Sequence, residues 1–171
     1  MTTAQELRDK KQTYWDDVEV GHEFPPLVIG PLMPTHLFRW SAAIENWHRI
    51  HYDQSFAIYH EQLPNILGQG SWKQSILPRY LKDLCLPDGW PWKVSFQHRA
   101  MIVPGDTLTV WAKVTKKYQE EGLGFLDLDV GMRHYAETCP GRATIVLPIR
   151  NGKPIPYPFV PPKKLVSQSG A

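Results

Sequence analysis

The chain has little cysteine, no long apolar run and no block of one charge, and each shortage excludes a class of protein. Its 171 residues contain two cysteines, Cys85 and Cys139, and no CxxC pair. A disulfide framework and a zinc site built on paired cysteines are therefore not indicated, and a reducing compartment is favoured. No stretch approaches the ~20 apolar residues that a membrane-spanning helix needs.

The charge distribution excludes a further class. Net charge is +2, with no basic cluster, so a surface that neutralises nucleic-acid phosphates is not suggested. Residues 1–11 are polar and of mixed charge, without the apolar region of a signal peptide. We therefore expect a cytoplasmic protein whose partners are neither nucleic acids nor membranes.

The composition is that of one folded domain. Hydrophobic residues make up 42% of the chain and charged residues 21%, which suits a single domain of this length with a full core. Seven tryptophans and 16 prolines are many for this length. Tryptophan suits subunit interfaces and binding tunnels, although we expect most of these rings in the core.

Apolar spacing predicts helices in the first half. A helix is expected from Thr35, as its N-cap, to about Asn46, and a short helix capped by Asp53 should follow. A long amphipathic stripe after Gly70 predicts the main helix, in which Pro78 favours a kink or a restart.

The second half reads as antiparallel strands. Four are predicted, with turns at 104–106 and 119–122: 93–103, 107–117, 124–133 and 142–150. We expect one domain over 1–171 with its core at about 14–150. Residues 151–171 form a proline-rich tail, extended over 154–162 and disordered over 163–171. The order of elements predicts an α+β fold, an antiparallel sheet wrapped around one long central helix, and not a Rossmann fold.

One run of eight residues, Asn-Trp-His-Arg-Ile-His-Tyr-Asp at 46–53, concentrates chemical groups. It holds two imidazoles, a carboxamide, a guanidinium and a carboxylate beside apolar residues. Histidine can take or give a proton near neutral pH, and the flanking groups can orient it. The run therefore predicts an acid/base site.

Several segments together resemble the MaoC-like hot-dog dehydratases: Phe38-Arg39-Trp40-Ser41-Ala42, the 46–53 run, Phe56-Ala57, Phe96 with Arg99, and Pro104-Gly105-Asp106-Thr107-Leu108. Within these, the resemblance is to the branch of the 3-hydroxyacyl-thioester dehydratase type 2 and the mesaconyl-CoA hydratases. Gly70, which lies 19 positions after His51, matches a His-Gly pair that opens the central helix in that branch. The resemblance extends from about residue 14 to 147.

The resemblance implies a single hot-dog domain, usually dimeric. It also implies reversible addition of water across the 2,3-double bond of an acyl thioester on coenzyme A or acyl carrier protein. This chemistry requires no metal or redox cofactor.

The chain departs from the more typical (R)-specific hydratases, whose motif is Asp-x-Asn-Pro-x-His. Asn46, His48 and Arg49 stand at the Asp, Asn and Pro places, which removes the usual Asp–His pair. The closer branch shares these three changes. Gln69 stands where that branch often has histidine.

Each residue of the predicted catalytic set has a structural alternative. His51 is expected to be the general acid/base, and the alternative is a hydrogen bond to its own loop. Asn46 is expected to hold the water or hydroxyl, or to cap the preceding helix, or both. His48 either shares the proton transfer or is structural. Gly70 is expected to present an N–H to the thioester carbonyl, and otherwise merely begins the helix.

Three further residues are predicted to bind the substrate: Arg49, Gln69 and Ser71. For Arg49, contact with the acyl-carrier phosphates competes with a buried pairing to Asp53.

Two other functions stay open, and the acyl group is not specified. A hot-dog thioesterase would need a carboxylate placed to activate water, which the histidine-rich run matches poorly. A non-catalytic or half-site subunit would join another hot-dog protein in a heteromeric hydratase.

Overall fold

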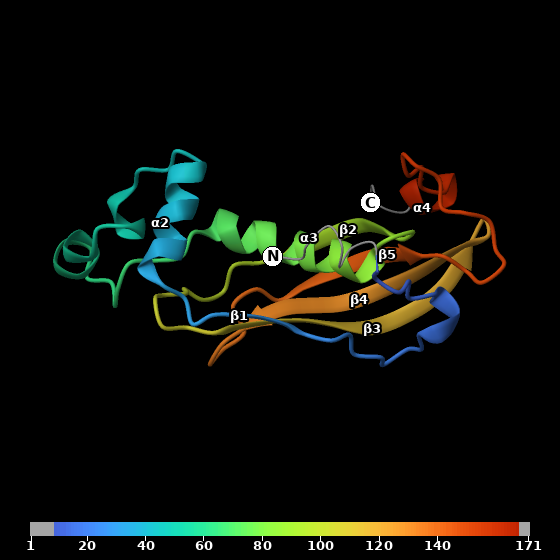
Figure 1. Cartoon of the computed structure of the whole chain (residues 1–171), viewed down its shortest axis with the longest axis horizontal. Helices are drawn as coiled ribbons and strands as arrows, with labels where there is room; N and C mark the ends of the chain where they lie inside the picture. The colour runs from blue at the N-terminus through green and yellow to red at the C-terminus, as the bar shows by residue number, and fades with distance from the viewer. Residues whose placement is uncertain (1–8, 168–171) are drawn as a thin grey trace.

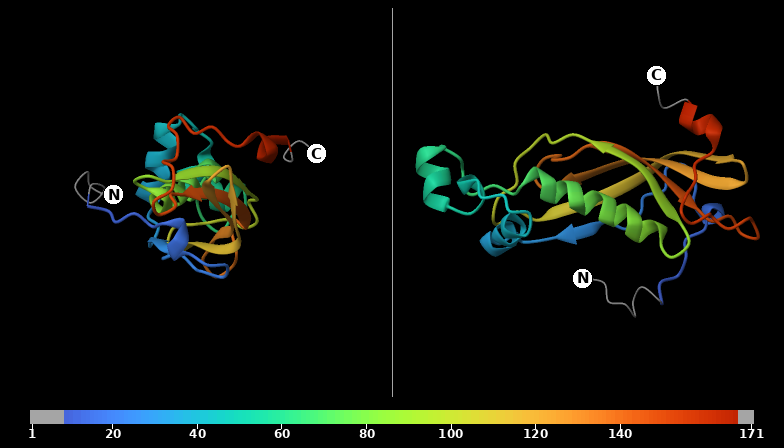
Figure 2. Two further views of the ribbon diagram at one scale, coloured as in Figure 1. Left: turned by 90° about the vertical axis from the view of Figure 1, so that its right-hand side faces the viewer. Right: turned by 90° about the horizontal axis from the view of Figure 1, so that it is seen from above.

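Five antiparallel strands form one sheet that curls around a 16-residue helix, α3 (Gly70–Cys85; Figures 1 and 2). The structure is a computed structural model that describes residues 9–167. The order across the sheet is β1-β3-β4-β5-β2, and each neighbouring pair is antiparallel. In chain order the strands are β1 (Leu27–Ile29), β2 (Trp90–Phe96), β3 (Leu108–Glu120), β4 (Leu123–Arg133) and β5 (Gly141–Leu147). The predicted α+β layout is confirmed.

The core lies between α3 and the inner face of the sheet. Alternate residues of β3 from Leu108 to Val114 point inward and are buried, as strand periodicity requires. One face of α3 meets them through Leu77, Tyr80 and Leu81. Burial of each such leucine contributes about 1.5–3 kcal/mol. The helix continues through Pro78 without a restart.

The β3–β4 hairpin turns in two residues. Glu121 and Gly122 both have a positive φ, 51° and 75°, so the backbone is left-handed at both turn positions. This geometry matches the twist of paired strands, and glycine adopts it without steric cost. Pairing consequently extends to Glu120 and Leu123, beyond the bounds predicted for these strands.

The C-terminal tail covers part of the outer face of the sheet. Ile155, Phe159 and Leu165 pack against a buried cluster of Leu123, Phe125 and Val146. The tail ends in the short helix α4 (Lys163–Ser167). The prediction of disorder is therefore wrong for 163–167, because Leu165 has an apolar surface to cover, and 168–171 lie outside the described residues.

The first predicted long strand has the wrong bounds. β2 begins at Trp90, before the predicted start at residue 93, because an edge strand can accept Pro91. Residues 97–103 are irregular instead of extended. The Lys73 side chain donates to the Ala100 carbonyl (2.8 Å), and the Gly68 N–H donates to that of Ile102 (2.8 Å). These bonds hold the segment against the start of α3.

Short helices form a lobe at one end of the molecule, opposite α4 (Figure 1). They are α2 (Pro34–Ala43), the 3₁₀ turn η2 (Arg49–His51) and the π-helical turn η3 (Phe56–His60); a further 3₁₀ turn, η1 (Trp15–Asp17), lies near the sheet. Met33, not Thr35, is the N-cap of α2, because Pro34 suits the first helical position. No helix within residues 9–167 is both long and apolar enough to cross a bilayer.

Candidate active site

The end of α2 positions the polar run. Ile44 is the C-cap, and Glu45 adopts the left-handed conformation (φ 53°) that closes many helices. The predicted cap at Asn46 is therefore wrong by two residues, although the Asn46 N–H still donates to the Ser41 carbonyl (3.0 Å). Its Oδ1 accepts from the His48 N–H (3.2 Å), which sets the direction of the next residues.

His51 is half-buried on η2 and anchored through one ring nitrogen. Nδ1 lies 2.9 Å from the Leu67 carbonyl. A carbonyl can only accept, so Nδ1 carries the proton in the neutral ring, and Nε2 is the nitrogen that can accept one. Burial lowers the pKa of His51, the Leu67 bond partly opposes this, and the charge of His48 adds to it. A neutral imidazole is therefore favoured.

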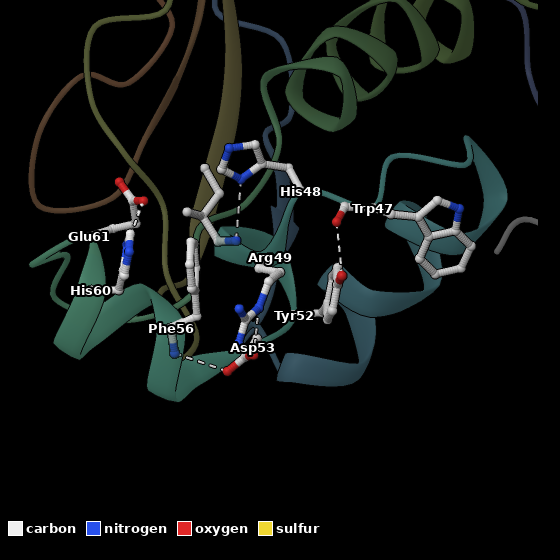
Figure 3. A network of polar contacts seen from close by, with 9 residues as sticks. Trp47, His48, Arg49, Tyr52, Asp53, Phe56, His60 and Glu61 are labelled. Atoms are coloured by element: carbon white, nitrogen blue, oxygen red, sulfur yellow. Dashed lines mark hydrogen bonds and ion pairs between the residues drawn. The ribbon is translucent and has the colours of Figure 1, made fainter.

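His48 is exposed and lies beside His51, with 6.1 Å between ring centroids. It is the N-cap of η2, where its Nδ1 accepts from the Ile50 N–H at 3.4 Å (Figure 3). Both predicted roles are compatible with this place, a structural one through Nδ1 and a proton-transfer one through Nε2.

Arg49 pairs with Asp53, as one alternative predicted, but at the surface. Its Nε and Nη2 lie 3.0 and 2.7 Å from Asp53 Oδ2, and its side chain is 56% exposed (Figure 3). The guanidinium also lies over the Phe56 ring, at 4.3 Å. Asp53 Oδ1 caps the helical turn that begins at residue 54 and leads into η3, by accepting from the Phe56 N–H (3.0 Å). This backbone bond, together with Arg49, lowers the pKa of Asp53.

Gln69 and Ser71 belong to a network that joins α2 to the start of α3. Gln69 is buried, and its Nε2 donates to Ser41 Oγ (2.7 Å). Ser71 Oγ donates to Gln69 Oε1 (3.3 Å) and accepts from Trp40 Nε1 (2.9 Å). The structure thus gives Gln69 a positioning role, and substrate contact by either side chain stays a prediction.

Gly70 is the first residue of α3, where backbone N–H groups lack partners within the helix. A Cβ here would stand 3.2 Å from His98 Nε2. The missing side chain therefore admits an imidazole against the first turn.

The structure brings together the two parts that the 19-residue spacing connects. The Leu67 N–H donates to the Ile50 carbonyl (2.9 Å), while His51 binds the Leu67 carbonyl. η2 is thereby tied to the segment that leads into α3. The His51 imidazole is thus bound to Leu67, three residues before Gly70. A second imidazole, that of His98, lies beside Gly70 itself.

Sequence reasoning missed His98 and the groups behind it. His98 Nδ1 lies 3.5 Å from Cys139 Sγ, and Lys73 is buried on α3. The one available signal was that His98 precedes Arg99, a residue of the family resemblance. Across residues 9–167, no three histidine, cysteine or acidic side chains converge to hold a metal ion.

Comparison with known proteins identifies the family. The sequence profile of the family "hydroxyacyl-thioester dehydratase type 2" matches residues 6–103. No curated protein matches the chain significantly.

Solved structures show the fold. The (R)-hydratase PhaJ1 from Pseudomonas aeruginosa has a TM-score of 0.69 at 14% identity, covering 87% of this chain and 94% of its own. The MaoC-like dehydratase from Rhodospirillum rubrum has a TM-score of 0.68 at 16% identity, covering 81% and 98%. A chain of the ChsH1–ChsH2 complex from Mycobacterium tuberculosis has a TM-score of 0.64 at 17% identity, covering 75% and 98%. The chain therefore has the hot-dog fold of the MaoC-like proteins and belongs to the hydroxyacyl-thioester dehydratase type 2 family.

Proposed function

We propose that this protein catalyses the reversible hydration of a 2-enoyl thioester, with His51 as its acid/base. The observation that carries the proposal is the bond from His51 Nδ1 to the Leu67 carbonyl, which directs the basic Nε2 away from the backbone. Family membership supplies the class of reaction. The thioester is carried on coenzyme A or acyl carrier protein.

The reaction in the dehydration direction needs one base and one set of N–H donors. His51 Nε2 takes the α-proton, and the electron pair of the C–H bond moves into an enolate on the thioester oxygen. The Gly70 N–H, at the positive end of α3, stabilises this charge. The enolate then expels the β-hydroxyl, which receives the proton from His51 and leaves as water. Hydration is the reverse sequence.

Asn46 and Arg49 orient the substrate in this scheme. Asn46 Oδ1 is occupied by the His48 N–H, so its amide N–H₂ is the group offered to the water or hydroxyl. Arg49 is exposed, which suits contact with carrier phosphates. A thioesterase receives less support, because the carboxylate of Asp53 already binds Arg49 and the Phe56 N–H.

The test is hydration of a panel of trans-2-enoyl-CoA thioesters, followed by loss of enoyl absorbance. We expect turnover by the wild type, a loss of about 10²–10⁴-fold in His51→Ala, and a smaller loss in Asn46→Ala. His60→Ala is the matched control and should leave the rate unchanged, because this exposed histidine at the end of η3 contacts the neighbouring Glu61. Equal rates for wild type and His51→Ala would refute the assigned role.

A second candidate is a half-site subunit, favoured by exposed apolar side chains on and beside the lobe of short helices. Trp47 is 57% exposed and Phe38 49%, which suits coverage by another subunit. We propose a homodimer, and the alternative is a heteromer of the kind named in the ChsH1–ChsH2 complex. Sedimentation of the purified chain decides between them: an active dimer supports self-sufficiency, and an inactive folded monomer supports the half-site subunit.

A further inference from the structure

We propose that His98 is a further catalytic residue, a neutral imidazole whose Nε2–H donates to the thioester carbonyl alongside the Gly70 N–H. The inference rests on the proposed function. It assigns a role to a histidine outside the 46–53 run, so the two imidazoles of the site have different roles. His51 moves the proton, and His98 holds the oxygen on which charge develops.

The position of His98 is the first support. It follows β2, and its Nε2 stands 3.2 Å from the point that a Gly70 Cβ would occupy. The ring is thus against the first turn of α3, where the backbone offers unpaired N–H donors. The residue as a whole is exposed, so the ring can meet a ligand. A carbonyl oxygen approaching the Gly70 N–H would come within reach of this nitrogen.

The neighbour on the other side of the ring sets the tautomer. Cys139 is fully buried, and burial raises the pKa of its thiol. It therefore remains S–H at neutral pH and can donate to His98 Nδ1, 3.5 Å away. With Nδ1 as acceptor, the ring proton resides on Nε2, the nitrogen beside Gly70. His98 is then a hydrogen-bond donor toward a ligand.

Partial burial of the ring and a nearby lysine favour the neutral imidazole, and the lysine also holds it in place. The pKa of His98 is lowered by the partial burial of its ring and further by the positive charge of Lys73. Lys73 Nζ also donates to the Ala100 carbonyl (2.8 Å), which fastens the segment after His98 to α3. A neutral donor that is fixed before substrate binds needs no reorganisation as charge develops on the oxygen.

Two substitutions separate donation from packing. His98→Leu removes the donor, whereas the amide N–H of His98→Gln can replace the one on Nε2. For enoyl-CoA hydration we expect kcat to fall about 10²–10³-fold in His98→Leu, with KM little changed. His98→Gln should stay within about tenfold of the wild type. Circular dichroism checks that each variant is folded, which the exposure of this side chain favours.

A binding measurement gives a readout that needs no turnover. The probe is 4-(dimethylamino)cinnamoyl-CoA, a chromophoric enoyl thioester whose absorbance shifts to the red when its carbonyl is polarised. We expect the shift with the wild type and His98→Gln, and its loss with His98→Leu. A red shift of the probe without turnover of any enoyl-CoA would refute the proposed function but support the assignment of His98. The assignment fails if His98→Leu retains the wild-type shift and rate, or if the bound wild type produces no shift.

Discussion

At the scale of single residues, the chemistry of the site depends on which ring nitrogen each histidine offers. His51 is bound through Nδ1 to the Leu67 carbonyl, which leaves Nε2 as the nitrogen that can accept a proton. His98 has Nδ1 against Cys139 Sγ, and a proton donated by this thiol would leave Nε2–H as the donor. In the two proposed roles the same side chain therefore acts in opposite ways, because the partner of Nδ1 is an acceptor in one case and a donor in the other.

His51 should have a lower pKa than a free histidine. Because burial lowers this pKa, we expect the His51 Cε1 resonance to report a titration below 6.5 in an NMR pH titration. His48→Gln should raise this pKa slightly, since it removes a like charge 6.1 Å away. Titration of His51 at or above 6.5 would contradict the burial argument.

His51 should make the stability of the fold depend on pH. The folded state binds the His51 proton less readily than the unfolded state, in which the pKa is near 6.5. The free energy of unfolding therefore has its highest value above pH 6.5, and it falls as the pH drops from 6.5 to the lower pKa of the folded state. The rate of dehydration should fall over the same window, because the base becomes protonated.

At the scale of elements, glycines mark where two elements touch. Gly70 faces His98, and a Cβ at 3.2 Å would push the ring by a few tenths of an ångström. Gly124 of β4 faces Trp15 of η1, where a Cβ would stand only 2.5 Å from Cγ. The first contact belongs to the site and the second to the scaffold.

Alanine at Gly70 should therefore affect mainly the rate, and alanine at Gly124 mainly the stability. Gly70→Ala should slow hydration about 10- to 100-fold and change the free energy of unfolding by less than about 1 kcal/mol. Gly124→Ala should cost about 1–3 kcal/mol by overpacking and leave kcat near that of the wild type. Urea unfolding and initial rates on both proteins check this, and a stability loss in Gly70→Ala as large as in Gly124→Ala would refute the distinction.

Tyr80 links α3 to the segment before β1, because its hydroxyl donates to the Pro25 carbonyl (2.9 Å) in a buried place. Tyr80→Phe should cost about 1 kcal/mol in urea unfolding. Tyr118→Phe is the matched control with a smaller expected loss, since its bond to Asp127 is 3.5 Å long.

Burial also raises the pKa of Tyr80 to about 12, from an ordinary value of 10.0. The unfolded state therefore loses this proton first, and stability should fall as the pH rises from 10 towards 12. The fall should be smaller in Tyr80→Phe. An equal fall in both proteins would show that the hydroxyl is not buried in this way.

At the scale of the whole molecule, the tail is part of the fold. Phe159 stacks on Trp90 and meets Trp92 edge-on, with 6.1 Å between ring centroids in each pair, and it packs against the outer cluster of β4 and β5 residues. The sheet therefore has apolar surface on both faces at this end, and only one of them is covered by α3.

Removal of the Phe159 ring tests this role. Phe159→Ala should lower the free energy of unfolding by about 1–2 kcal/mol, the value for losing a half-buried aromatic side chain. Tyr157→Ala, in which the ring removed is 87% exposed, should change it by less than about 0.5 kcal/mol. A urea midpoint for Phe159→Ala equal to that of the wild type would show that this ring contributes nothing to stability.

The sequence by itself determined what is local. The stripe after Gly70 predicted α3, and the alternation from Leu108 to Val114 predicted β3, because periodicity along the chain sets which side chains share a face. Asp53 was correctly expected to cap the next turn, whereas the run at 46–53 as the source of catalytic groups stays a prediction.

Only the tertiary structure decided what depends on distant partners. Residues 97–103 leave the strand conformation because Lys73 and Gly68 bind their carbonyls. The tail is ordered by an apolar surface on β4 and β5. His98 meets Gly70 and Cys139 across 28 and 41 positions of sequence. No local pattern encodes such contacts, because they arise from packing between elements and not from the period of any one of them.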